Sequence, residues 1–151
     1  MEFISENYAG FSISTNKSKL DIRLIHKYLS EESYWAKNIP LELIYQSIEN
    51  SLNFGIYYEN IQIGYARIIS DYTTFAYLCD VFILSDYQGK GLSQWLLNTI
   101  NQHPNLQNLR RWMLMTLDAQ EVYKKNGWQI AQHPERVMEK YVPNIYQNPL
   151  I

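Results

Sequence analysis

One glycine-bearing segment has the residue types of a phosphate site: residues 86–93 read DYQGKGLS, between an apolar run and a helical pattern. Such a turn exposes backbone N–H groups at the positive end of the helix dipole, where phosphates bind. Gly89 and Gly91 lack a Cβ, so the backbone can approach a pyrophosphate closely, and Lys90 adds a mobile cation. The alternative is an ordinary strand-to-helix turn, and the glycines alone leave both interpretations open.

The spacing of this segment excludes two common nucleotide-binding motifs. A Walker A loop needs Gly, four residues and then Gly-Lys-Ser/Thr, whereas Lys90 stands alone between two glycines. The dinucleotide fingerprint G-x-G-x-x-G needs a glycine at position 94, which is Gln94. The segment therefore predicts a phosphate-binding turn of neither type.

A single carboxylate, Asp80, interrupts the apolar run FAYLCDVFIL at residues 75–84. A carboxylate in such a run costs free energy unless it is paired or used. Asp80 is therefore a candidate general base, acting directly or through water, or a group that binds the acceptor. The alternative is a structural carboxylate that is bonded to neighbouring backbone or tyrosine and keeps the sheet in register.

Hydrophobic periodicity predicts the elements that position these residues. Alternation and apolar runs predict strands at 11–15, 54–58, 61–70, 75–84 and 111–117, with two further candidates at 128–131 and 137–141. Helical spacing predicts helices from the Asp21 cap to about 29, from Pro40 to 52, from Gly91 to about 102, and from an Asp118 cap to Gly127. Glu121 stands at the capping-box position of the last helix. Residues 30–38 are expected to form a loop. This order predicts a mixed α/β fold with the strands in the middle.

Composition narrows the class of protein. The chain has 151 residues, so we expect one domain over 1–151, and 46% hydrophobic residues exclude general disorder. A net charge of −2 without massed basic residues argues against nucleic-acid binding. Cys79 is the only cysteine, which excludes an internal disulfide and fits a reducing compartment, and the three histidines show no metal spacing. Without a long apolar stretch or a signal-peptide pattern, a cytoplasmic protein with no membrane partner is expected.

The glycine-bearing segment resembles the acyl-CoA pyrophosphate loop of the GNAT N-acetyltransferase superfamily, Arg/Gln-x-x-Gly-x-Gly/Ala. Gln88 and Gly91 fill the first two fixed positions, and Ser93 stands where Gly or Ala is usual. Residues 119–128, AQEVYKKNGW, are similar to the family's A-x-x-x-Tyr-x-x-x-Gly-Phe segment, with Trp128 in place of Phe. The resemblance covers roughly residues 54–141 and both N-terminal helices. Segments 33–36 (SYWA) and 71–81 (DYTTFAYLCDV) look like a group of bacterial GNAT proteins whose acceptors are poorly defined.

The resemblance implies a GNAT acyltransferase fold, with a central, mostly antiparallel sheet that is splayed at the CoA site and flanked by helices. It implies acetyl-CoA as co-substrate and no metal. It also implies that Tyr123 protonates the departing CoA thiolate, a role open to a phenol that is protonated at neutral pH. The alternative is that Tyr123 only packs against the sheet. The expected acetyl-CoA-binding residues are Phe82, Ile83, Leu84, Gln88, Gly89, Lys90, Gly91, Leu92, Ser93 and Ala119.

The loop between the first two helices is where this superfamily receives its acceptor. Glu31, Tyr34 and Trp35 are the expected acceptor-binding residues there, with Glu32 beside them. Acids next to aromatic rings suit a cationic amine. A solvated acidic helix end is the alternative for the two glutamates.

Together these features predict an acetyl-CoA-dependent N-acetyltransferase. It would transfer the acetyl group directly to a primary amine of a small molecule or peptide. The alternatives are a catalytically inactive CoA-binding or regulatory GNAT module and a scaffold that binds no CoA. The sequence identifies neither the acceptor nor the acyl-chain preference. Many relatives dimerise, and the C-terminal tail from Tyr141 could serve an interface, so a homodimer stays open.

Overall fold

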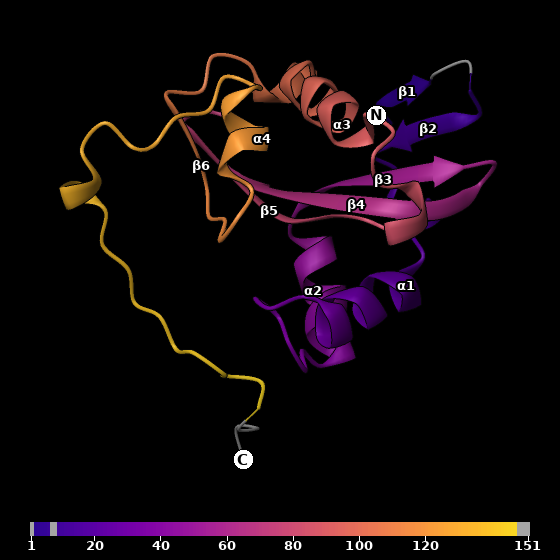
Figure 1. Ribbon diagram of the computed structural model, residues 1–151, viewed down its shortest axis with the longest axis horizontal. Helices are drawn as coiled ribbons and strands as arrows, with labels where there is room; N and C mark the ends of the chain where they lie inside the picture. The colour runs from indigo at the N-terminus through magenta and orange to yellow at the C-terminus, as the bar shows by residue number, and fades with distance from the viewer. Residues whose placement is uncertain (1, 7–8, 148–151) are drawn as a thin grey trace.

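A six-stranded sheet in the order β1-β2-β3-β4-β5-β6 forms the centre of the computed structural model, which describes residues 2–6 and 9–147 (Figure 1). All neighbouring strands are antiparallel except β5 and β6, which are parallel. The predicted mixed, mostly antiparallel sheet is confirmed. The strands are β1 (Ile4–Glu6), β2 (Phe11–Ser14), β3 (Leu52–Tyr58), β4 (Ile61–Ser70), β5 (Phe75–Ile83) and β6 (Arg111–Leu114).

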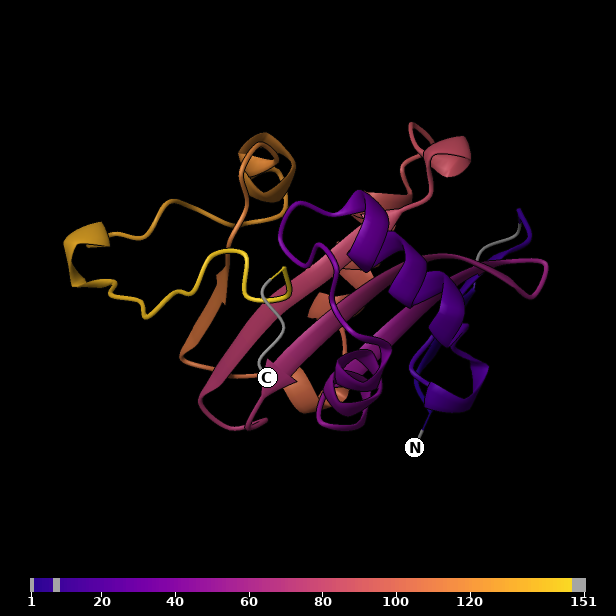
Figure 2. The same cartoon turned by 90° about the horizontal axis from the view of Figure 1, so that it is seen from below.

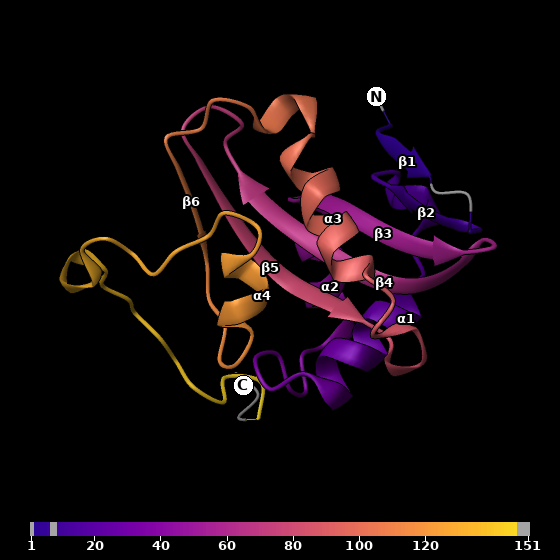
Figure 3. The same cartoon turned by 45° about the horizontal axis from the view of Figure 1, so that its top comes forward.

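Helices cover both faces of the sheet. The helices α1 (Ile22–Lys27) and α2 (Leu41–Glu49) lie on one face, and α3 (Leu92–Asn101) and α4 (Gln120–Lys124) lie on the other (Figures 1 and 3). A π-helical turn, Tyr28–Glu32, continues α1, and short 3-10 turns occupy Lys17–Lys19, Ser85–Tyr87, Pro104–Leu106 and Pro134–Arg136. Within the part of the chain that the structure describes, no helix has the length and apolar character needed to cross a membrane.

The burial of α3 sets the position of the glycine-bearing segment. Leu92, Leu96 and Ile100 recur every four residues, so they share one helix face, and all three are buried against the sheet. Residues 84–91, which include the glycines, join the end of β5 to the start of this helix. Because both ends of the segment are anchored in the core, its backbone is held in one place.

The parallel strands β5 and β6 stay together for only part of their length. Their register runs from Phe75 opposite Arg111 to Leu78 opposite Leu114. Beyond that point β6 ends, while β5 continues to Ile83. The sheet is therefore open beside the second half of β5, and the predicted splay is confirmed.

Several predicted boundaries were wrong for local reasons. The segment from Ser30 begins inside the π-helical turn instead of a loop, and Leu52 begins β3 instead of extending α2. Asp118 does not cap α4: Ala119 holds the N-cap position without a side-chain cap, and Glu121 pairs with Lys124 at 3.2 Å. The strand β1 was not predicted, because three residues carry too little alternation to stand out.

The two strands predicted at 128–131 and 137–141 are absent from the described part of the chain. This region instead extends away from the sheet, interrupted by the turn at Pro134–Arg136 (Figures 1 and 2). Near the end of the described chain, Tyr146 packs against the buried hydrophobic cluster to which α1 and α2 contribute. The strand prediction failed because alternating apolar and polar residues favour an extended strand but do not provide the neighbouring strand with which it must pair.

We expect Leu96→Ala to lower the free energy of unfolding by about 2–5 kcal/mol, because it leaves a cavity between α3 and the sheet. Leu96 is fully buried in the cluster that anchors this helix. Urea denaturation of the purified variant measures the effect.

Leu43→Ala is the matched control, since Leu43 lies on α2 and is 36% exposed. Its cost should be about 0.5 kcal/mol, as for other surface substitutions. Equal losses in the two variants would contradict the packing role given to α3.

Candidate active site

The glycine-bearing segment forms an open cradle at the start of α3. Gly89 and Gly91 have φ angles of 76° and 78°, which is the left-handed conformation that favours glycine. A Cβ built on either residue would meet no atom within 4 Å, so the space above the backbone is open. The cradle is held from below, because the Gln88 side chain donates a hydrogen bond of 2.9 Å to the Ile83 carbonyl.

The backbone N–H groups of this cradle lack protein acceptors. Gly91 is the N-cap of α3 and makes no side-chain cap hydrogen bond. Across residues 2–6 and 9–147, no protein acceptor contacts the N–H groups of Gly89 through Ser93. Donors that converge at a helix N-terminus are suited to a phosphate or pyrophosphate. The cradle therefore offers free N–H donors and open space above its backbone, which suit a phosphate group.

The other residues that are predicted to bind acetyl-CoA differ in their exposure. Phe82, Ile83 and Leu92 are buried, so their side chains support the site from the core. Lys90 is exposed at the rim of the cradle. Leu84 and Ser93 are partly exposed, and Ala119 begins α4 on the same face of the sheet as α3.

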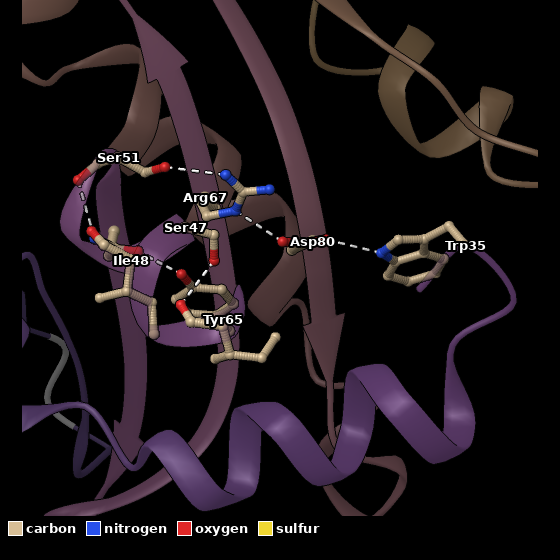
Figure 4. A network of polar contacts seen from close by, with 9 residues as sticks. Trp35, Ser47, Ile48, Ser51, Tyr65, Arg67 and Asp80 are labelled. Atoms are coloured by element: carbon tan, nitrogen blue, oxygen red, sulfur yellow. Dashed lines mark hydrogen bonds and ion pairs between the residues drawn. The ribbon is translucent and has the colours of Figure 1, made fainter. Parts of the chain in front are cut away.

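Asp80 lies at a bulge where β5 passes the open part of the sheet. Tyr65 pairs with Phe82 and Arg67 pairs with Cys79, so β5 has one more residue than β4 between these pairs. Asp80 has a φ of 54°, a left-handed conformation that aspartate adopts more readily than most residues. The bulge re-aims the Asp80 side chain toward Arg67 and Trp35 (Figure 4).

Both carboxylate oxygens of Asp80 accept hydrogen bonds from the protein. Arg67 Nε donates to Oδ2 at 2.8 Å, and Trp35 Nε1 donates to Oδ1 at 2.8 Å (Figure 4). The Arg67 and Asp80 side chains are 16% and 10% exposed. Burial lowers the pKa of Arg67, but the charge and hydrogen bond of Asp80, together with nearby Cys79 and Tyr65, outweigh burial and the pKa is raised overall. Arg67 therefore remains charged and holds the carboxylate in place.

The predicted acceptor loop connects two parts of the site. Tyr34 and Trp35 pack edge to face with ring centroids 5.0 Å apart. Trp35 reaches β5 through Asp80, while the Tyr34 hydroxyl accepts a hydrogen bond of 2.9 Å from the Leu117 N–H. Glu31 and Glu32 are exposed on the preceding turn and form no ion pair with any residue that the structure describes. The structure thus brings Trp35 to Asp80 but leaves Glu31 outside this network.

Tyr123 lies on α4 within an aromatic cluster. Its ring packs against Trp128 with centroids 6.1 Å apart, and Trp128 packs against Trp112 of β6. Burial raises the pKa of Tyr123 to about 12, with a further contribution from nearby Tyr34. The phenol is therefore protonated at neutral pH and can donate a proton. A hydrogen bond between Gln94 and Asn126 joins α4 to α3.

Two further titratable groups, Cys79 and His103, have pKa values that burial shifts. Burial, together with the nearby Asp80, raises the pKa of Cys79 to about 12, so the thiol stays protonated. His103 is buried between Phe3 and Phe54, and burial lowers its pKa. Among the described residues, no three His, Cys, Asp or Glu side chains gather in a way that could hold a metal ion.

Sequence reasoning missed Arg67, Ser51 and Leu117. Arg67 donates to Asp80 and to the Ser51 hydroxyl, the latter at 3.0 Å. Arg67 is the only charged residue in the run IQIGYARIIS. A single charge in a mostly apolar run is the signal that indicated Asp80, and the same signal could have indicated Arg67. Leu117 contributes a backbone N–H, and no side-chain pattern could have indicated it.

Comparison with known proteins agrees with this geometry. The profile of the acetyltransferase (GNAT) domain matches residues 49–130. A protein of Gibberella zeae that carries an acetyltransferase name is 30% identical, over 77% of each chain. A Xanthomonas campestris crystal structure assigned to the GNAT family is 46% identical, with a TM-score of 0.89 over 91% of this chain and 97% of the other.

A more distant structure shares the fold. A GNAT family acetyltransferase from Elizabethkingia anophelis, solved with acetyl-CoA bound, is 16% identical with a TM-score of 0.62, over 89% of this chain and 90% of the other. The domain match spans more than half of the chain and contains the cradle, the bulge and Tyr123. The chain therefore belongs to the GNAT acetyltransferase family.

Proposed function

We propose that this protein transfers an acetyl group from acetyl-CoA directly to a primary amine of a small molecule or a peptide. The observation that carries the proposal is the row of unpartnered N–H groups from Gly89 to Ser93 at the start of α3. Those donors suit a pyrophosphate, and the open end of β5 lies directly before them. The Elizabethkingia anophelis relative, which binds acetyl-CoA, supports the same choice of co-substrate.

The reaction places three demands on the protein. The amine nitrogen must lose a proton, since on the order of one alkylammonium in a thousand is neutral at pH 7. That nitrogen forms a bond to the thioester carbon, and the carbon–sulfur bond breaks. The departing thiolate takes a proton, and protonated Tyr123 is the donor we propose. Tyr123 is reprotonated from solvent, which also receives the amine proton.

The acceptor is proposed to approach the loop that carries Tyr34 and Trp35. These side chains are 57% and 40% exposed, so each retains an accessible aromatic surface beyond its hydrogen bond. Aromatic faces attract an alkylammonium, and the exposed Glu31 and Glu32 add negative charge at the approach. This combination favours a cationic amine acceptor.

The assignment of Asp80 as general base stays a prediction, and its contacts favour a different role. Each oxygen already accepts a hydrogen bond, from Trp35 or from Arg67. Protonation of either oxygen would weaken the contacts that hold the acceptor loop against β5. We therefore infer that Asp80 is a positioning residue for Trp35, with solvent as the proton acceptor.

The second candidate is a GNAT module that binds acetyl-CoA without catalysis. Tyr123 argues against it, because an inactive module has no need for a protonated phenol in this position. Release of free CoA thiol, measured with a panel of primary amines, separates the two functions. Thiol release with any amine supports the enzyme, whereas acetyl-CoA binding without thiol release across the panel supports the module.

Gly91→Val should abolish acetyl-CoA binding, with at least a tenfold loss of affinity in calorimetry. A β-branched residue is strained at a φ of 78°, and its side chain would occupy the space above the cradle. Gly127→Val is the matched control, because Gly127 has a φ of 89° and equally open surroundings at the end of α4. It carries the same backbone strain and should retain affinity. Unchanged affinity in Gly91→Val would exclude the cradle as the pyrophosphate site.

Tyr123→Phe should lower turnover by about 10²–10⁴ while acetyl-CoA affinity is retained, because only the proton donor is lost. Tyr45→Phe is the control: Tyr45 is 51% exposed on α2 and its hydroxyl has no role in the proposed site. If turnover of Tyr123→Phe falls less than about threefold, Tyr123 only packs against its neighbours and is not the proton donor.

The same donor predicts the shape of the wild-type pH profile. Because the pKa of Tyr123 is raised to about 12, the phenol stays protonated and turnover should not fall between neutral pH and about pH 11. Turnover should instead rise with pH as the amine deprotonates and then level off. A decline in turnover that begins near pH 10 would contradict this, because it would mean that the proton donor has the ordinary pKa of a phenol.

Asp80→Asn tests positioning against base catalysis. In the positioning role it should raise the acceptor KM and lower stability, with little change in the pH profile of kcat. Pairing it with Arg67→Gln should restore part of the stability, since the single variant leaves the largely buried Arg67 charge unpaired. A kcat that falls about 10²–10⁴ and recovers at high pH would instead identify Asp80 as the base.

A further inference from the structure

Arg67 carries more hydrogen-bond donors than the protein uses. Of the five N–H groups that a guanidinium has, Nε–H donates to Asp80 and one Nη1–H donates to the Ser51 hydroxyl (Figure 4). Nη2 has no acceptor within the ranges 2–6 and 9–147. Among those residues, Tyr57 Oη is the one side-chain polar atom that is both sealed from solvent and unpartnered, so Nη2 keeps contact with solvent. Arg67 therefore presents free donors outward.

These donors lie on the face of the sheet that α1 and α2 cover only in part. Tyr65 and Arg67 are two residues apart on β4, so their side chains share a face, and Tyr65 is fully buried in the cluster to which α1 and α2 contribute. The next residue of that face, Ile69, is 43% exposed, and Cys79, which pairs with Arg67 on β5, is partly exposed. Arg67 is therefore at the border between the covered and the open part of this face.

Asp80 connects Arg67 to the acceptor loop. Its carboxylate accepts a hydrogen bond of 2.8 Å from Arg67 Nε and another of 2.8 Å from Trp35 Nε1, so it lies between the two side chains (Figure 4). Trp35 is 40% exposed and packs edge to face with Tyr34. An acceptor that packs on these rings therefore lies next to the pair formed by Arg67 and Asp80.

Asp80 is the one anion among the neighbours that shift the pKa of Arg67. The other two, Cys79 and Tyr65, are protonated at neutral pH because burial raises the pKa of each. The guanidinium thus has a single charged partner, and that partner leaves Nη2 free. A second carboxylate that arrives at Nη2 would form a charge-assisted hydrogen bond.

The two ends of this region carry charge of opposite sign. Glu31 and Glu32 are exposed on the turn before the aromatic loop, and neither forms an ion pair in the described part of the chain. The Arg67 guanidinium, with its free donors, lies at the other end. A molecule that carries both an ammonium group and a carboxylate complements the two ends, since each of its groups meets the opposite charge.

We propose that the acceptor is a carboxylate-bearing amine and that Arg67 Nη2 donates hydrogen bonds to its carboxylate. The amine nitrogen then lies on the side of Tyr34 and Trp35, and its acetylation yields an N-acetylated acid in which the carboxylate is unchanged. This inference rests on the proposed acetyl transfer and specifies its acceptor. A site that pairs a substrate group rejects an analogue without that group, because the donors of the site are left unpaired. Arg67 is thereby a specificity-determining residue as well as the partner of Asp80.

Matched sets of acceptors test the proposal on the wild-type protein. Release of free CoA thiol is measured for amino acids with different side chains, each beside its carboxamide and its decarboxylated amine, and rates are compared per neutral amine. For the amino acids that are acetylated, kcat/KM should exceed that of both analogues at least tenfold, mainly through a lower KM, as one charge-assisted hydrogen bond predicts.

Dipeptides form a further arm that identifies the source of the carboxylate. A larger kcat/KM for a dipeptide than for the free amino acid assigns the carboxylate to a peptide C-terminus, and a smaller one assigns it to a free amino acid. Both results support the carboxylate contact, provided that the dipeptide amide is the poorer substrate.

Arg67→Lys tests the residue itself, because lysine keeps a charge beside Asp80 but lacks the further nitrogens of the guanidinium. It should lower the ratio of kcat/KM between an amino acid and its decarboxylated amine at least tenfold. General damage to the fold lowers both values, so a change in their ratio reports the carboxylate contact. If Arg67→Lys does not fold, Arg67→Gln combined with Asp80→Asn removes both charges together and is measured in the same way. Arg110→Lys is the matched control, since Arg110 is exposed just before β6, and it should keep the wild-type ratio.

The outcomes separate this inference from the proposed function. Thiol release that is indifferent to the carboxylate, or a ratio that stays unchanged in folded Arg67 variants, would overturn the inference and leave acetyl transfer intact. Absence of thiol release with every amine would overturn both.

Discussion

The ion pair between Arg67 and Asp80 joins two strands at the point where the sheet opens. It spans the bulge in β5, so it stabilises a left-handed residue in a position that an uninterrupted strand would not contain. Breaking a largely buried pair by removing one partner costs about 3–5 kcal/mol, because the remaining charge is left unpaired. Trp35 and Ser51 attach to the same pair, so two distant segments depend on it. The bulge, the acceptor loop and the open end of β5 are therefore one connected arrangement.

The cradle at the start of α3 depends on burial and backbone conformation, and within the described residues it has no such ion pair. Leu92, Leu96 and Ile100 anchor α3, and the left-handed glycines turn the preceding backbone so that its N–H groups stay free. Gln88 fixes the segment by a bond to the end of β5. Asp80, with its ion pair to Arg67, thus lies within β5, and the free N–H groups of the cradle lie beyond the end of the same strand. The spacing between the ion pair and the cradle is therefore set by the end of β5 and the short segment that follows it.

Much of this arrangement could be predicted because its signals are local in sequence. The glycine spacing, the apolar face of α3 and the limits of β4 each depend on neighbouring residues. The partners of Asp80 could not be predicted in the same way, since Trp35 and Arg67 lie 45 and 13 residues away along the chain. The Asp118 cap failed because α4 begins one residue later than expected, with Ala119 at the N-cap position and no side-chain cap hydrogen bond. The C-terminal strands failed for a third reason: alternation along one segment does not supply the neighbouring strand with which it must pair.

The two segments that are proposed to receive the substrates lie on opposite sides of the sheet. The cradle lies at the start of α3 on one face of the sheet, whereas α1 lies on the other face (Figure 1). Tyr34, in the segment that follows α1, reaches the Leu117 N–H with its hydroxyl. Neither substrate then has to depart before the other arrives. The proposed arrangement therefore allows both substrates to be bound at once in a ternary complex. The partly buried Cys79, whose pKa is raised to about 12 by burial and the nearby Asp80, stays protonated and is unsuited to act as a nucleophile in a ping-pong route.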